Sequence, residues 1–212
     1  MLAIFYILCY YIDGDYMKIL FGTRNKNKVV EAKAIFLSVI PNVELVSLDE
    51  IDPNRTIEEP IEDGNSFYEN SLIKAKYYFE KTNIPTICDD SGIVVDALNG
   101  APGIHSARYA ETPQARIDRV LNEMQGIKNR TACFKCCMTL LNPQGEVAFS
   151  FTGVCEGSII KGQRGTNGFG YDPIFMIDEE TSVAMISDEE KNKISHRAEA
   201  MRKLAEVLRA NA

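Results

Sequence analysis

The sequence predicts a mixed α/β fold. Apolar runs typical of strands alternate early in the chain with segments of helical periodicity, and two later strands flank the turn sequence NPQG, which indicates an antiparallel hairpin. Hydrophobic residues make up 45% of the 212 positions, which is enough to build a sizeable core. The length suits one large domain or two lobes that share a core, and we see no internal repeat, low-complexity tract or clear linker that would divide residues 17–212.

The folded part is expected to begin with a strand, a polar loop and a helix. Residues 18–23 (KILFGT) predict a buried strand, and apolar residues recur at helical spacing from Asn27 onward. Residues 43–52 alternate between apolar and polar side chains, which predicts a second strand. Residues 53–65 contain prolines, Gly64 and several acids, so they are expected to form an acidic loop.

The next helix is predicted to begin at Ser66, because Ser66 and Glu69 have the spacing of a capping box. Its side chains are expected to divide into a core-facing stripe (Tyr68, Leu72, Ala75, Phe79) and two that point away from the core (Asn70, Lys74). Residues 84–88 predict a third strand. The sequence Asp89-Asp90-Ser91-Gly92 would lie at the carboxyl end of that strand.

The second half of the chain is expected to contain a helix, a hairpin and a glycine-rich loop. The helical periodicity ends at Gly126. Residues 131–141 and 146–155 are predicted to be the two strands of the hairpin. Residues 162–172 (GQRGTNGFGYD) predict a loop, and the last helix is expected to begin near Ser187.

The overall charge argues against nucleic-acid partners, and the short apolar run at the start of the chain argues against a membrane partner. With a formal charge of −7 and a pI near 5.0, the surface as a whole would repel a phosphate backbone, so nucleic-acid polymers are not expected partners. The apolar run at residues 2–12 is too short to cross a bilayer and lacks the features of a signal peptide. We expect no membrane partner, and we treat residues 1–16 as an extension, either weakly structured or the product of an alternative start.

The six cysteines raise the question of a metal site or disulfides. Cys133 and Cys136 form one Cys-x-x-Cys pair, which is half of a zinc site, but the sequence has no second pair and only two histidines. Cysteines that alternate along a predicted strand are typical of buried thiols in a reducing compartment. We therefore expect neither zinc nor disulfides, and a cytoplasmic location.

A cluster of polar and basic residues lies between the first strand and the first helix: Thr23, Arg24, Asn25, Lys26, Asn27 and Lys28. The amino end of a helix offers unpaired N–H groups and a partial positive charge, and three cations crowd this one. The composition suits a polyphosphate. A solvated polar loop with Asn27 as the N-cap is an equally good interpretation of these residues alone.

The acidic loop before the second predicted helix is the first candidate for a metal site. Carboxylates at Glu58, Glu59, Glu62 and Asp63 would help near an anion if a hard divalent cation lay between them, because Mg²⁺ is typically held by one or two carboxylates, phosphate oxygens and water. The alternative is a solvated loop whose negative charge favours the following helix.

The pair Asp89-Asp90 is the second candidate. Ligands of α/β proteins usually bind at the carboxyl ends of strands, and Gly92 would permit a tight turn there. One aspartate could hold Mg²⁺ while accepting a proton from an attacking water, and Ser91 could donate to phosphate. A turn with two solvated acids remains the alternative, although two like charges side by side favour a nearby cation.

Two further segments could bind the flat ring of a ligand. In GTNGFGYDP, glycines let the backbone approach a ligand, Phe169 and Tyr171 can stack on a ring, and Asp172 can accept from ring N–H groups. Lys191 and the sequence Ser195-His196-Arg197 could meet phosphate or carbonyl oxygens. The alternatives are a flexible loop with aromatic packing and a solvated helix face.

Six motifs in a fixed order resemble the inosine triphosphate pyrophosphatase family: T-x-N-x-x-K, E-D-G-x-[ST]-F-x-E-N-[AS]-x-x-K-A, D-D-S-G, G-A-P-G-I-x-S-A-R, G-F-G-Y-D-P-[IF]-F and E-K-x-x-I-S-H-R. The resemblance covers residues 17 to about 210. It implies two α/β lobes around a long mixed sheet with flanking helices, an active-site cleft between the lobes, and a homodimer. It also implies Mg²⁺-dependent hydrolysis of non-standard purine triphosphates (ITP, dITP, XTP) to the monophosphate and pyrophosphate.

The resemblance also implies roles for individual residues. Residues 23–28 would bind phosphate, Glu62 and Asp90 the metal, with Asp90 as proton acceptor, Lys74 as the catalytic lysine and Ser91 touching substrate. The purine pocket would comprise Phe169, Gly170, Tyr171, Asp172, Lys191, His196 and Arg197. The chain departs from the family pattern at Arg24, where relatives often carry a small residue, at Asn167, commonly glycine, and in residues 1–16.

Two other functions compete with this one. A nucleotide-binding protein could use the same residues without turnover, although Asp90, Lys74 and Glu62 argue against it. A pyrophosphatase of the Maf type, which acts on modified pyrimidine nucleotides, is disfavoured by the F-G-Y-D and S-H-R signatures. The sequence does not rank ITP, dITP and XTP.

Overall fold

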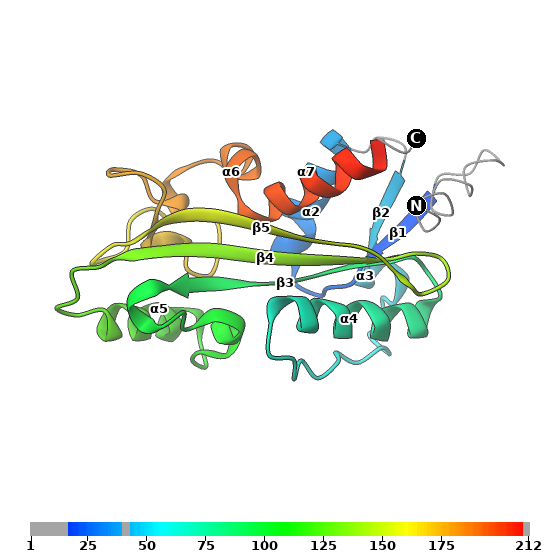
Figure 1. Ribbon diagram of the computed structural model, residues 1–212, viewed down its shortest axis with the longest axis horizontal. Helices are drawn as coiled ribbons and strands as arrows, with labels where there is room; N and C mark the ends of the chain where they lie inside the picture. Colours follow the sequence, from blue (N-terminus) through cyan, green and yellow to red (C-terminus); the bar gives the residue numbers. More distant parts are fainter. Residues whose placement is uncertain (1–16, 40–42, 210–212) are drawn as a thin grey trace. The chain divides into compact units, whose positions relative to one another are not determined.

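The computed structural model describes residues 17–39 and 43–209 (Figure 1). The expectation for residues 1–16 lies outside the described residues. The chain divides into two compact units, one comprising Met1–Asp90, Cys137–Thr152 and Ala200–Ala212, and the other Ser91–Cys136 and Gly153–Glu199.

A six-stranded sheet with the strand order β2-β1-β3-β4-β5-β6 forms the framework. Its strands are β1 (Met17–Phe21), β2 (Val43–Ser47), β3 (Thr86–Val95), β4 (Thr131–Leu141), β5 (Val147–Ile159) and β6 (Phe175–Met176). Strand β1 pairs in parallel with β2 and β3, whereas β5 and β6 are antiparallel. The sheet is therefore mixed, and β3, β4 and β5 each contribute residues to both units.

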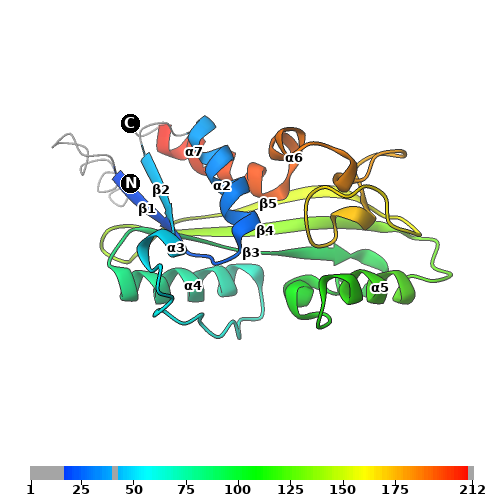
Figure 2. The ribbon, with the colours of Figure 1, turned by 180° about the vertical axis from the view of Figure 1, so that it is seen from behind.

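The helices flank this sheet, as the α/β prediction requires. They are α2 (Lys26–Val39), α3 (Leu48–Ile51), α4 (Phe67–Thr82), α5 (Pro113–Glu123), α6 (Asp188–Ile194) and α7 (His196–Arg209), with short 3-10 turns at Asp96–Leu98, Gly103–Arg108, Asp172–Ile174 and Val183–Met185. Within the first unit, α2 and α4 cover opposite faces of the strands (Figure 2). Among the described residues, none of the helices has both the length and the apolar character needed to span a bilayer.

Each unit has a hydrophobic core of its own. In the first, Leu20, Leu48, Tyr78 and Leu141 pack together, and in the second Ile93, Val120, Phe134 and Phe175 do so. The start of α3, whose Leu48 belongs to the first core, makes one prediction wrong. Residues 43–52 do not form one strand, because the Glu50 carboxylate accepts hydrogen bonds from Ser47 N at 2.6 Å and Ser47 Oγ at 2.7 Å, which starts α3 directly after β2.

The buried thiols and the hairpin agree with the sequence prediction. Cys88, Cys133, Cys136 and Cys137 are buried, and burial raises the pKa of the half-buried Cys155 to about 11. Strands β4 and β5 are neighbours joined by the predicted turn, in which Gly145 N donates to Asn142 O at 2.9 Å. Strand β5 runs to Ile159, four residues beyond the predicted end.

Two helix predictions need correction. Helix α4 begins as predicted, with Ser66 Oγ accepting from Glu69 N at 3.1 Å, and most of the predicted stripe faces the core: Ala75 is fully buried, and Leu72 and Phe79 pack against the core. The prediction is wrong for Asn70, which is fully buried, for Lys74, which is 9% exposed, and for Tyr68, which is 43% exposed. The last helix is two helices, because Ser195 adopts an extended conformation with ψ of 153° between α6 and α7.

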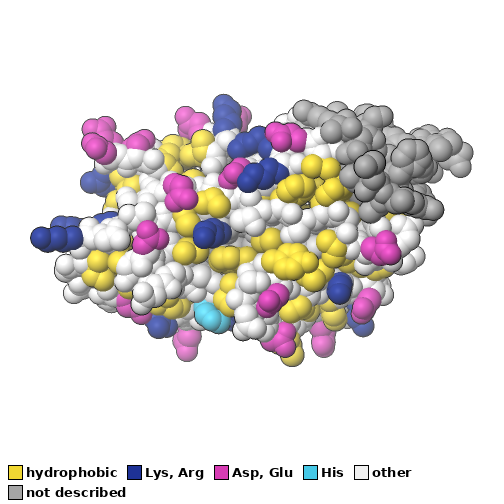
Figure 3. Space-filling model, in the orientation of Figure 1, with side chains coloured by type: hydrophobic (Ala, Val, Ile, Leu, Met, Phe, Trp, Pro, Cys, Tyr) yellow, Lys and Arg dark blue, Asp and Glu magenta, His cyan; other side chains and the backbone are white. Residues whose placement is uncertain are grey.

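The third strand is also longer than predicted. Residues Asp89-Asp90-Ser91-Gly92 lie inside the ten-residue strand β3, not beyond its end. A Cβ on Gly92 would lie 2.3 Å from Gly103 O and 2.4 Å from Ser106 Oγ, so the glycine permits close approach of a neighbouring turn, not a turn of its own. Figure 3 shows acidic and basic side chains interspersed on the visible face.

Candidate active site

The loop between β1 and α2 presents an exposed helix terminus that is capped by its own side chains. Asn25 Oδ1 accepts from Asn27 N at 3.1 Å and from Lys28 N at 3.2 Å, so Asn25 caps α2, not Asn27 as the sequence suggested. Thr23 Oγ1 in turn accepts from Asn25 N at 3.2 Å. Asn25, Lys26 and Asn27 are exposed, which leaves this end of the helix accessible to an anion.

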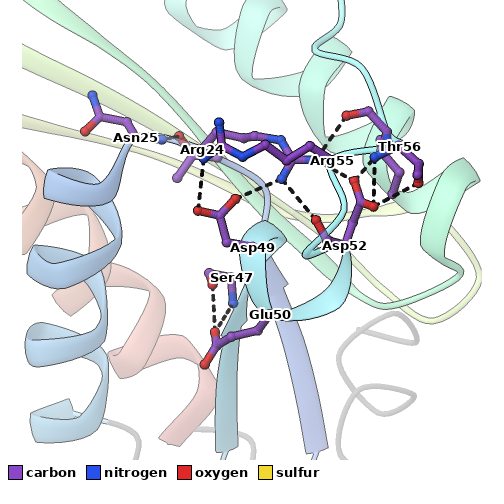
Figure 4. A network of polar contacts seen from close by, with 10 residues as sticks. Arg24, Asn25, Ser47, Asp49, Glu50, Asp52, Arg55 and Thr56 are labelled. Atoms are coloured by element: carbon purple, nitrogen blue, oxygen red, sulfur yellow. Dashed lines mark hydrogen bonds and ion pairs between the residues drawn. The ribbon is translucent and has the colours of Figure 1, made fainter.

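Arg24 is the one member of this loop that the structure directs elsewhere. Its guanidinium binds Asp49 Oδ1 at 2.9 Å and Asp52 Oδ2 at 2.6 Å, and its side chain is only 9% exposed (Figure 4). Thr23, Asn25 and Lys28 thus remain candidate phosphate ligands, whereas Arg24 pairs with Asp49 and Asp52.

Asp89 and Asp90 point to opposite faces of the sheet, as neighbouring residues of a strand do. Asp89 Oδ2 lies 3.0 Å from Lys28 Nζ of α2. Asp90 meets α4 instead: Asn70 Nδ2 donates to its Oδ2 at 3.1 Å, and Lys74 Nζ lies 3.5 Å from its Oδ1. The two adjacent carboxylates therefore avoid each other, and each has a lysine beside it.

Lys74 also binds the acidic loop. Its Nζ donates to Glu62 Oε2 at 2.9 Å, so the ammonium group contacts both Glu62 and Asp90. We name Lys28, Glu62, Lys74, Asp89 and Asp90 the acidic cluster, because its carboxylates outnumber its lysines. The cluster lies within the first unit and joins α2, the acidic loop, α4 and β3.

Burial sets the proton affinities in the acidic cluster. Burial raises the pKa of Asp90 above its usual value, although Lys74, Lys28 and the Asn70 hydrogen bond oppose the shift. Burial would by itself lower the pKa of Lys74, but Asp90, Asp89 and Glu62 outweigh it and raise that pKa. Lys74 is accordingly charged at neutral pH, and the Asp90 carboxyl has an increased affinity for a proton.

Asn70 connects Asp90 to the end of the acidic loop. While its amide nitrogen donates to Asp90, its Oδ1 accepts from Gly64 N at 2.9 Å. A Cβ on Gly64 would lie 2.7 Å from that same oxygen, so only glycine allows this approach. Sequence reasoning missed Asn70, and the signal that could have found it is its place four residues before Lys74, on the same helical face.

The acidic cluster fits a hard divalent cation. Glu62 and Asp90 offer carboxylate oxygens around one ammonium group, and oxygen is the ligand that Mg²⁺ prefers. Within residues 17–39 and 43–209, His, Cys, Asp and Glu nowhere gather in a group of three or more that could hold a metal by themselves. An ion held by Glu62 and Asp90 would thus need phosphate or water as further ligands, which is how Mg²⁺ is usually bound with nucleotides.

The second unit holds the residues of the predicted purine pocket. Asp172 Oδ2 accepts from Lys191 Nζ at 2.5 Å and from Phe169 N at 2.7 Å, and both charged side chains are buried. Lys191 Nζ also lies 4.3 Å from the centroid of the Phe169 ring. Gly168 has a φ of 72°, and a Cβ there would lie 2.1 Å from Asp172 Oδ2, so the loop can fold around the carboxylate only with glycine.

Tyr171 has a different place from the one expected of a stacking residue. Its side chain belongs to the hydrophobic core of the second unit, its hydroxyl donates to Ser106 O at 2.8 Å, and burial raises its pKa to about 12. Phe169 is half-buried, and Gly170 follows it with a φ of 65°. Phe169 is thus the aromatic ring of this loop that remains available to a ligand.

The remaining predicted residues meet at the start of α7. The Arg197 guanidinium donates to Ser91 Oγ at 3.2 Å and is almost completely buried. His196 stacks on Phe134 with ring centroids 5.0 Å apart and an interplanar angle of 17°. Ser91 thus contacts a cation in this structure, and Phe134, which orients His196, is a residue that the sequence pattern did not reveal.

A buried acid–lysine cluster near an exposed helix N-terminus has the chemistry to bind phosphate together with a hard cation, which suits an enzyme that acts on phosphorylated substrates. The Ham1 family model matches residues 19–207, so the chain belongs to the Ham1 family. This confirms the resemblance that the motifs indicated.

Individual relatives are similar over nearly the whole chain. A dITP/XTP pyrophosphatase of Bacillus cereus is 43% identical over 198 residues, covering 90% of this chain and 94% of the relative. A dITP/XTP pyrophosphatase of Treponema denticola is 38% identical over 205 residues, covering 92% of this chain and 100% of the relative.

Solved structures give the same result for the fold. The structure of a Ham1 protein from Coxiella burnetii has a TM-score of 0.80 and 34% sequence identity, covering 92% of this chain and 99% of that chain. The Ham1 protein of Staphylococcus aureus has a TM-score of 0.78 and 35% identity, covering 92% of this chain and 100% of that chain. The predicted fold class is therefore confirmed.

Proposed function

We propose that the protein hydrolyses non-standard purine nucleoside triphosphates, namely ITP, dITP and XTP, to the monophosphate and pyrophosphate. The observation that carries the proposal is the acidic cluster: Lys74 lies between Glu62 and Asp90, and burial raises the pKa of Asp90. Membership of the Ham1 family and the names of the similar pyrophosphatases support the choice of substrate.

In this proposal the metal is Mg²⁺, held by Glu62 and Asp90. When bound, the ion supplies positive charge that offsets the charge of the triphosphate. Lys28 and Lys74 bind phosphate oxygens, helped by Thr23, Asn25 and the partial positive charge at the exposed start of α2. Because Lys28 and Lys74 are held by carboxylates, they are oriented before the phosphates arrive.

Asp90 is the proposed proton acceptor. Hydrolysis between the α and β phosphates needs a base that takes a proton from the attacking water. A carboxylate whose pKa is raised by burial serves better than one in water, and Asn70 fixes its orientation through the 3.1 Å hydrogen bond to Oδ2. Lys74 favours the ionised form of Asp90 before the reaction, because its positive charge opposes protonation.

The second unit is proposed to select the base. Phe169 would stack on the purine, and Asp172, already oriented by Lys191, would accept from ring N–H groups. Donors on His196 and Arg197 would meet the 6-oxo group of hypoxanthine or xanthine. Adenine presents an amino group at that position, so those donors would lose their acceptor, which disfavours ATP.

Two finer features belong to the same proposal. We propose a homodimer, on the basis of the family resemblance, and light scattering of the purified protein would measure its mass directly. We also propose a cytoplasmic location, which accords with four buried cysteine thiols, and fractionation of cells that express a tagged chain would test it.

The decisive experiment measures pyrophosphate release from ITP, dITP, XTP, GTP, ATP and dUTP, with Mg²⁺ and with excess chelator. We expect turnover of the first three, little turnover of ATP, and loss of activity with chelator. Preference for a pyrimidine nucleotide would favour a Maf-type enzyme. Binding of ITP without pyrophosphate release would indicate a nucleotide-binding protein, and either result would overturn the proposal.

A further inference from the structure

Arg24 lies in the predicted phosphate loop but makes all its described polar contacts with another segment. Its two terminal nitrogens donate to Asp49 Oδ1 at 2.9 Å, Asp52 Oδ2 at 2.6 Å, Ile57 O at 3.1 Å and Asp52 O at 3.4 Å. Figure 4 shows the guanidinium reaching toward the end of α3 and the chain that follows it. A planar donor fork suits several acceptors at once, as here.

Asp52 is the centre of this contact. Besides Arg24, its carboxylate accepts from Thr56 N at 2.9 Å, from Thr56 Oγ1 at 2.8 Å and from Ile57 N at 2.8 Å. These bonds, the one from Ile57 N above all, hold the pKa of Asp52 well below its usual value. The carboxylate thus organises the turn at residues 52–57, and Arg24 attaches that turn to the loop that begins at Thr23.

The turn opens the acidic loop, which has little else to hold it. Residues 53–65 contain no helix or strand, and most of their side chains are exposed or half-buried. The far end of the loop is fixed where Asn70 Oδ1 accepts from Gly64 N. Glu62, which binds Lys74, lies between these two attachments, and its side chain is still 28% exposed.

We propose that Arg24 and Asp52 are positioning residues, which fix the start of the acidic loop so that Glu62 stays at Lys74 and available to the metal. This inference rests on the proposed function and assigns Arg24 a role other than contact with phosphate. An arginine shared by two carboxylates and two carbonyls would leave a buried, uncompensated Asp52 if it moved to a ligand, which opposes such a movement.

Hydrogen exchange of the metal-free protein tests the positioning without any assay of activity. In Arg24→Gln we expect amides of residues 53–65 to exchange several-fold faster than in the unaltered protein, with α5 unchanged. Arg55→Gln is the matched control: Arg55 belongs to the same network but reaches only Asp49, at 3.5 Å, and is 58% exposed. It should leave exchange in the loop unchanged.

The Mg²⁺ dependence of ITP hydrolysis is the second measurement. Loss of a residue that orients a metal ligand typically costs about 10-fold or more in metal affinity, so the Mg²⁺ concentration for half-maximal rate should rise by about that factor in Arg24→Gln. The rate at saturating Mg²⁺ should fall much less. Asp52→Asn should act alike, and the double variant Arg24→Gln/Asp52→Asn should be little worse than either single one.

The outcomes separate this inference from the function itself. If the unaltered protein does not hydrolyse ITP, the proposed function fails, while the exchange experiment still tests the positioning. Unchanged exchange in the loop, or faster exchange with an unchanged Mg²⁺ dependence, would overturn the inference. A raised KM for ITP at every Mg²⁺ concentration would show instead that Arg24 binds phosphate. Should Arg24→Gln not fold, Arg24→Lys serves, because lysine keeps the charge without the fork.

Discussion

Each of the two units pairs lysine with carboxylate, but the balance of charge around the lysines differs. In the acidic cluster, Lys28 and Lys74 face three carboxylates, Glu62, Asp89 and Asp90, so negative charge is in excess. In the second unit, Lys191 and Asp172 neutralise each other, and the carboxylate also accepts from a backbone N–H. The first arrangement suits a cation and a proton transfer, whereas the second suits recognition of an uncharged ring.

Asp90→Asn should have the largest effect on activity. The amide cannot accept a proton, and loss of a general base typically lowers turnover by about 10²–10⁴-fold. The fold should survive, because Lys74 keeps Glu62 at 2.9 Å. Initial rates of pyrophosphate release and a calorimetric melting temperature measure the two properties. A rate near that of the unaltered protein would exclude Asp90 as the base.

Asp172→Asn should have the opposite effect, a large loss of stability with a smaller loss of turnover. It leaves Lys191 without a carboxylate in a buried site, and breaking a buried ion pair typically costs about 3–5 kcal/mol of stability. We expect a lower free energy of unfolding in urea and a raised KM for ITP, with a smaller change in kcat. The control is Asp118→Asn, an exposed acid of α5 that should change neither. Equal stability losses in Asp90→Asn and Asp172→Asn would refute the distinction between the clusters.

Asn70→Asp should shift the pH dependence. The new carboxyl cannot donate as the amide does, and its negative charge would raise the pKa of Asp90 further. Since Asp90 accepts a proton only when ionised, activity is lost as the pH falls through this pKa, and the acid limb of the pH–rate profile should move to higher pH. We expect about a 10-fold loss of kcat/KM at neutral pH.

The matched control for that variant is Ser71→Ala. Ser71 is also fully buried on α4, but its hydroxyl bonds Thr139 Oγ1 at 2.7 Å, away from Asp90. The pH profile of Ser71→Ala should coincide with that of the unaltered protein. A shift of the same size in both variants would mean that any change in α4 moves the profile, and the role of Asn70 would be lost.

Tyr171→Phe should have the smallest effect. It removes one hydrogen bond to Ser106 O while keeping the ring in the core, which costs about 1 kcal/mol of stability. Urea unfolding measures this loss, and the KM for ITP should not change. A clearly raised KM would show that the tyrosine contacts the substrate, as the sequence pattern first indicated.

Local patterns predicted much of the fold, and failed where tertiary packing decides. The hairpin and the start of α4 follow from turn and capping residues, which act over a few positions. The apolar stripe of α4 was predicted for Leu72, Ala75 and Phe79, but the burial of Asn70 and Lys74 was not, because their partners lie on β3 and the acidic loop. Hydrophobic periodicity identifies the apolar core-facing side and does not reveal a buried polar site beside it.

The candidate site was predicted as a set of residues but not as a set of contacts. Glu62, Lys74 and Asp90 lie together in the first unit, whereas Lys28 lies beside Asp89, which points to the other face of β3. Arginine is a side chain typical of phosphate ligands, yet the orientation of Arg24 depends on Asp52, 28 positions away in the sequence. No local signal distinguishes a guanidinium that faces a ligand from one that faces a distant carboxylate.

The opposite orientations of Asp89 and Asp90 make the function of β3 depend on its alignment. A single-residue deletion between Thr86 and Asp89 would move the next side chain into each place, so that Asp90 would face Lys28 and Ser91 would face Lys74. Both acids would still be present in the sequence, but the place beside Asn70 and Lys74 would have lost its carboxylate. In this strand, then, the count of residues matters as much as their identity.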